Sequence, residues 1–138
     1  MPWLHALWIG LLGALGLEAL TVFLRFGLGW RSPERTRPLA KLTRGWRLHH
    51  GYPGLVLMPV AIPIYTLLPG SEPTWMLWIA PAILAAGIAL AVSDLIHHAL
   101  VLPFLAGSHE FELHYPGHPR HKPAPVIREP WRPRRRAA

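Results

Sequence analysis

Asp94, His97 and His98 lie within a strongly apolar stretch, Thr74 to Phe104, in which Asp94 is the only fully charged residue. On a helix, Asp94 and His98 share one face at a spacing of four residues, and His97 lies beside them. Carboxylate and imidazole groups in this arrangement are suitable ligands for Zn, Fe, Mn or Cu. A metal site is therefore the chemical hypothesis for this stretch.

Further imidazoles occur where the neighbouring apolar blocks begin or end. A histidine pair precedes the middle block, and a histidine followed by a glutamate comes shortly after the last one. Imidazole and carboxylate are the groups that complete the coordination shell of a metal ion. The predicted ligands are His49, His50, Asp94, His97, His98 and His109, with Glu110 as a polar neighbour. The sequence assigns no catalytic residue and leaves the metal and the presence of enzymatic activity open.

Two other interpretations of the histidines stay open at this point. Such a cluster can handle protons or sense pH, or it can consist of interfacial imidazoles without a specific role. His114, His118 and His121 fall in a segment that is expected to be loose, and they are left out of the site. The chain has no cysteine, which excludes disulfides, thiolate nucleophiles and cysteine-ligated iron-sulfur clusters.

Glu18 and Arg25 are the charged residues of the first apolar block, 1–30. Ionisable groups inside membrane helices are usually paired or functional, so an ion pair of Arg25 with Glu18 or Asp94 is one interpretation. Gly10 and Ala14 precede Glu18 at four-residue steps and predict a close packing seam. The third block has a similar face, which runs from Ala80 through Gly87 and Ala91 to Asp94 and His98. We expect the first and third helices to pack together.

Three apolar blocks, at approximately 3–30, 51–69 and 74–104, are each long enough to cross a hydrocarbon core about 30 Å thick. The sequence therefore predicts an all-α integral membrane protein with three transmembrane helices. Pro53, Pro59, Pro63 and Pro69 predict a kinked middle helix, because each internal proline removes a backbone hydrogen bond.

The distribution of positive charge predicts the orientation. Six Lys/Arg lie between Arg31 and His50, and seven follow Ala106. The positive-inside rule then places the N-terminus outside and the C-terminus in the cytoplasm of an inner (plasma) membrane. The predicted domains are a transmembrane domain, 1–106, and a basic, proline-rich cytoplasmic tail, 107–138.

The net charge of +7 favours anionic phospholipids at the cytoplasmic face as partners. The basic tail lacks a folded module that reads nucleic acid, so nucleic acid is not predicted as a partner. The first hypothesis for function is a small membrane protein with a cytoplasm-facing His/Asp site that binds metal and acts on a membrane-associated substrate. The alternative is a non-enzymatic accessory or assembly subunit, in a homo-oligomer or a larger membrane complex. Transport would require oligomerisation, because three crossings contain no inverted halves.

Overall fold

The computed structural model of the chain describes residues 2–30, 36–67, 76–107 and 112–123. Within these ranges every regular element is helical, and the single strand-like pairing is an isolated bridge between Trp46 and His114. The all-α prediction is confirmed for this part of the chain. The chain divides into two compact units, one formed by 1–30 with 49–95 and the other by 31–48 with 96–138.

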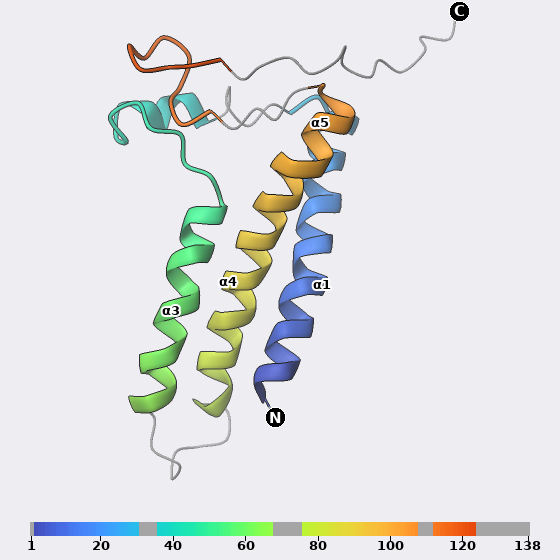
Figure 1. The fold of residues 1–138 in the computed structure, drawn as a ribbon, viewed down its shortest axis with the longest axis vertical. Coiled ribbons are helices and arrows are strands. Elements are labelled where there is room, and N and C mark those ends of the chain that lie inside the picture. Colours follow the sequence, from blue (N-terminus) through green and yellow to red (C-terminus); the bar gives the residue numbers. More distant parts are fainter. Residues whose placement is uncertain (1, 31–35, 68–75, 108–111, 124–138) are drawn as a thin grey trace, which may run out of the picture. The chain divides into compact units, whose positions relative to one another are not determined.

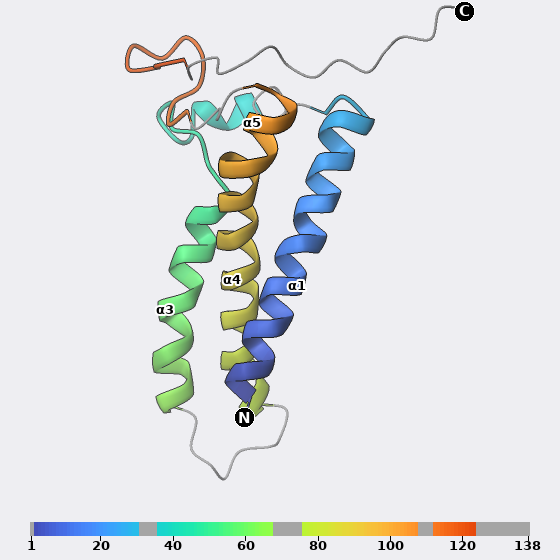
Figure 2. The same ribbon diagram turned by 45° about the vertical axis from the view of Figure 1, so that its right-hand side comes forward.

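Three helices build the first unit. They are α1 (Pro2–Val22), α3 (Gly51–Leu67) and α4 (Ile79–Ile96), the last preceded by a short 3-10 turn, Met76–Trp78. The helices lie side by side, with α4 between the other two (Figures 1 and 2). Helices α1 and α4 run in the same direction, and α3 runs against them.

Small residues make the contacts between these helices. A Cβ on Gly10 of α1 would lie 2.8 Å from the Cβ of Ile88 and 2.9 Å from the carbonyl oxygen of Ala85, both in α4. A Cβ on Gly54 of α3 would lie 2.6 Å from the backbone nitrogen of Ala91. Glycine at these places allows the backbones to approach closely, as in helix pairs that associate within lipid.

The predicted pairing of the first and third helices is confirmed, but the face of α4 differs from the expectation. The Gly87 and Ala91 face packs against α3, where a Cβ on Gly87 would lie 2.9 Å from Met58. Ala85, Ile88 and Ala89 turn toward α1 instead. Because α4 lies between two neighbouring helices, it packs through two faces that contain small residues rather than through one.

Both long helices continue through a π turn. Phe23–Gly27 extends α1, and His97–Val101 leads from α4 into the short α5 (Leu102–Leu105). The resulting helices, Trp3–Gly27 and Ile79–Leu105, are long and apolar enough to cross a membrane. Helix α3 has 17 residues with Pro59 and Pro63 inside it. A third crossing and a kink in α3 stay predictions.

In the second unit, the described part of the tail is ordered. The backbone N–H of Arg47 donates to the carbonyl of Leu113 (2.9 Å), and the N–H of Tyr115 donates to the carbonyl of Gly45 (3.0 Å). Arg47 also forms an ion pair with Glu112, 3.0 Å between Nη1 and Oε2. These contacts hold 112–115 against 45–47, so the expectation of a loose segment was wrong at His114, which is buried.

The rings of His114 and His118 stack almost in parallel, 4.6 Å between centroids. Burial lowers the pKa of the His114 imidazole, and positive charge on His118, Arg120 and His121 lowers it further. Gly45 lies against this stack with a φ of 85°, a conformation that favours glycine.

Candidate metal centre

Asp94 meets the histidine pair that precedes α3. The Asp94 carboxylate lies in the last turn of α4 and is buried. Its Oδ1 is 3.3 Å from Nδ1 of His50 and 3.9 Å from Nδ1 of His49. Helix α3 begins directly after this pair, with the N–H of Tyr52 donating to the carbonyl of His49 (3.1 Å). The residues just before one helix and the last turn of another thus bring two imidazoles to one carboxylate.

Gly51 makes this approach sterically feasible. A Cβ on Gly51 would lie 2.6 Å from Oδ2 of Asp94 and 2.9 Å from its Cβ, closer than real Cβ contacts. Because the Cβ of Asp94 is fixed by the backbone of α4, rotation of the carboxylate alone would not relieve the clash. The start of α3 can therefore touch Asp94 only where the residue has no side chain.

His98 follows Asp94 by one turn on the continuous helix Ile79–Leu105. One ligand atom from each of His49, Asp94 and His98 lies within 4.8 Å of the others. Ligand atoms bound at about 2.0–2.1 Å from a metal lie at most about 4.2 Å apart. A small closure of this group is therefore enough to hold an ion.

Two imidazoles and one carboxylate form a specific donor set. Non-haem iron enzymes use such a set with open positions, and catalytic zinc sites use three protein ligands in a similar way. The group of His49, Asp94 and His98 does not include His50 or His97. His50 instead faces the carboxylate oxygen of Asp94, as an outer-shell residue that orients a ligand does.

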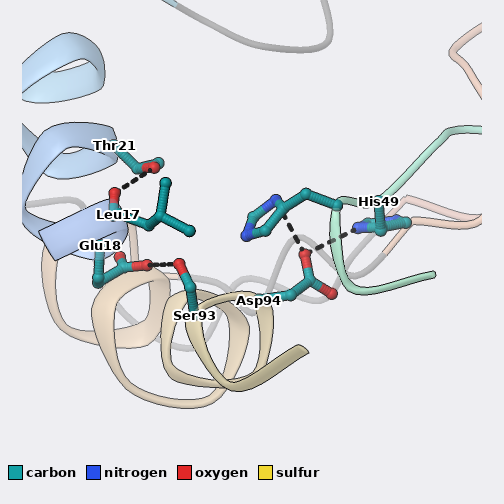
Figure 3. A network of polar contacts seen from close by, with 7 residues as sticks. Leu17, Glu18, Thr21, His49, Ser93 and Asp94 are labelled. Atoms are coloured by element: carbon teal, nitrogen blue, oxygen red, sulfur yellow. Dashed lines mark hydrogen bonds and ion pairs between the residues drawn. The ribbon is translucent and has the colours of Figure 1, made fainter. Parts of the chain in front are cut away.

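A second polar contact lies beside this site. Ser93 Oγ, which is fully buried, donates to Oε2 of Glu18 at 3.3 Å. Figure 3 shows Ser93 and Asp94 leaving α4 in different directions, Ser93 toward Glu18 of α1 and Asp94 toward His49. One turn of α4 therefore joins both neighbouring helices through polar side chains. In the next turn of α1, Thr21 donates its hydroxyl to the carbonyl of Leu17 (2.9 Å).

The other predicted residues are placed as follows. His97 is buried in the π turn, and its ring is perpendicular to that of His98, with 5.4 Å between the centroids. Arg25 lies in the π turn that follows α1, with its guanidinium carbon 5.5 Å from the ring centroid of Phe26. His109 and Glu110 lie outside the described residues.

Ser93 and Gly51 are the residues near the site that the sequence analysis did not single out. A signal for each was present, since Ser93 directly precedes Asp94 and Gly51 directly follows the histidine pair. The π turn at His97–Val101 was also not predicted, and such turns are frequent at functional sites.

Comparison of the chain with protein-family models, with curated proteins and with solved structures finds no match.

Proposed function

We propose that this chain is a small multi-pass protein of the inner (plasma) membrane that binds a transition-metal ion through His49, Asp94 and His98. The observation that carries this proposal is the mutual distance of their ligand atoms, within 4.8 Å. The site faces the cytoplasm when the N-terminus is outside, as the positive charge of the 31–50 stretch favours.

The distribution of side chains in the first unit supports a membrane location. Its buried positions are mostly alanine and glycine, whereas large apolar side chains such as Leu12, Leu55 and Ile62 are exposed. In the apolar windows of the two long helices, only 17% and 39% of residues are buried. Soluble proteins seldom expose apolar surface on this scale, whereas lipid is a suitable solvent for it.

The donor set supports a catalytic or redox role over a structural one. Among the described residues, three side chains are placed to hold the ion. Structural zinc sites are closed by four protein ligands, whereas three protein ligands leave positions for water or substrate. A bound ion would act there as a Lewis acid or a redox centre on a membrane-associated substrate. The carboxylate and imidazoles of this chain would hold the ion, and His50 would orient Asp94 through its 3.3 Å contact.

Elemental analysis of the purified protein tests the proposal. The wild-type protein, reconstituted separately with Zn, Fe, Mn or Cu and then dialysed, is expected to retain one equivalent of one of these metals. Asp94→Asn, His49→Ala and His98→Ala are expected to lose it. His5→Ala is the matched control, because His5 is an exposed histidine at the beginning of α1. Wild-type protein that retains no stoichiometric metal would refute the proposal.

A role as an accessory subunit is supported by a different observation. An apolar hollow of about 320 Å³ opens along α1 and α4, lined largely by alanine with Ile9, Gly13 and Trp78. A Cβ on Gly16 of α1 would meet nothing within 4 Å, so this small residue also faces outward. Small residues on lipid-facing surfaces allow further helices to dock. Native-detergent mass measurement tests this role, and a strictly monomeric species without partners would contradict it.

A further inference from the structure

Residues 36–48 of the second unit form a compact segment whose apolar side chains point outward. Arg37–Ala40 is a 3-10 turn, and the carbonyl of Ala40 accepts a hydrogen bond from the N–H of Gly45 (2.7 Å). Arg44 and Gly45 have φ values of 53° and 85° and reverse the chain. The segment therefore has a defined local structure of its own.

Leu42 is 82% exposed, the largest exposed fraction among the large apolar side chains of the described residues. Leu39 lies three residues earlier, within the 3-10 turn, and it is exposed as well. Leu48 and Trp46 are also exposed. Four large apolar side chains within ten residues are thus 41–82% exposed, although one side of the Trp46 ring contacts His114, at 4.9 Å between ring centroids.

Positive charge accompanies these side chains. The segment contains four bases and no acid. Arg47 is neutralised by Glu112 at 3.0 Å, whereas Arg37, Lys41 and Arg44 are exposed and take part in no ion pair among the described residues. Apolar side chains combined with bases are typical of segments that lie in the interface of an anionic bilayer, where tryptophan is also enriched.

Only two residues, His49 and His50, join the segment to α3. Leu48 is three residues before Gly51, where α3 begins. If α3 crosses the membrane, the residues that precede it lie at a membrane surface. We propose that the 36–48 segment lies in the headgroup region of an anionic bilayer, with its leucines among the acyl chains and its three exposed bases against lipid phosphates. This inference rests on the membrane location proposed above, but not on the metal.

Fluorescence of a single labelled cysteine tests the inference, because the chain has no native cysteine. Leu42→Cys carries an environment-sensitive NBD group, and the protein is placed in nanodiscs of phosphatidylcholine with or without phosphatidylglycerol. The expected result is a blue-shifted emission in the anionic discs that lipids spin-labelled near the headgroup quench. Each of Arg37→Gln, Lys41→Gln and Arg44→Gln is expected to lower the equilibrium constant between the lipid-bound and the water-exposed segment about fivefold, measured as the ratio of blue-shifted to water-like NBD emission.

The outcomes separate this inference from the proposed function. An NBD group at Ile62→Cys, an exposed position in α3, reports whether α3 lies in hydrocarbon through quenching by lipids spin-labelled deep in the acyl chain. If Ile62 is quenched but Leu42 emits as in water in both lipids, the interfacial segment is refuted and the membrane location stands. Blue-shifted emission at Leu42 that lipid spin labels do not quench would indicate cover by protein, which also refutes it. Absence of deep quenching at Ile62 would refute the membrane location itself.

Discussion

Replacing Gly51 with alanine tests whether the close approach of α3 to Asp94 positions the metal ligands. The added Cβ would lie 2.6 Å from Oδ2 and 2.9 Å from the Cβ of Asp94. Rotation of the carboxylate can relieve the Oδ2 contact, but the Cβ contact is fixed by the backbone. Ordinary contact begins at 3.4 Å, so relief of the Cβ contact requires a relative shift of about 0.5 Å. Metal-ligand distances tolerate only about 0.2 Å. Because the shift moves the start of α3 away from Asp94, it opposes the closure that the three ligand atoms need to hold an ion.

The expected result is a loss of metal affinity of about 10- to 100-fold, as for changes that misplace a ligand without removing it. Metal titration of the purified protein, followed by competition with a chelator, measures this affinity. Gly16→Ala is the matched control, because its Cβ would meet nothing within 4 Å. Circular dichroism establishes that both variants remain helical. A folded Gly51→Ala protein with wild-type affinity would show that the contact does not position Asp94.

Three further predictions concern packing, polar contacts and pH. Gly54→Ala places a Cβ 2.6 Å from the backbone nitrogen of Ala91 and is expected to destabilise the first unit by about 1–3 kcal/mol, measured by unfolding in detergent; unchanged stability would contradict the close packing of α3 on α4. Ser93→Ala removes a hydrogen bond from the buried Glu18 and is expected to lower the free energy of unfolding by about 1–3 kcal/mol. A double-mutant cycle with Glu18→Gln should show that the two changes in unfolding free energy are not additive. Burial lowers the pKa of His114, so the unfolded state binds its proton more readily than the folded state. The pairing of 45–47 with 113–115 is therefore expected to be stable above pH about 6.5 and to weaken as the pH falls below it. Exchange protection of the Tyr115 amide, corrected for intrinsic rates, should fall on acidification in the wild type but not in His114→Gln, and a pH-independent wild type would contradict the burial of a neutral imidazole.

Several features could be predicted from the sequence because they depend on local order along the chain. The three apolar blocks predict the helices α1, α3 and α4, and helical periodicity predicts the Gly10, Ala14 and Glu18 face, whose members lie in or beside the contact with α4. The spacing of Asp94 and His98 likewise predicts that both side chains belong to one site. Each of these inferences needs only the geometry of a single helix.

The histidines that join Asp94 required the tertiary structure. The stretch from Ile79 to Val92 has small residues on every side, so its sequence does not determine which face turns to α1 and which to α3. Backbone contacts at Gly10 and Gly54 determine the rotation of α4, and with it the direction of Asp94 toward His49 and of Ser93 toward Glu18. In the tail, likewise, the pairing with 45–47 depends on residues more than sixty positions away.

The sequence by itself determined which chemical groups this protein has and which helices carry them, because residue type and helical period are local properties. The tertiary structure decided which of these groups meet. The contact of Gly51 with Asp94 joins residues 43 positions apart, and its geometry follows from steric fit between two helices. No pattern along one helix contains that information.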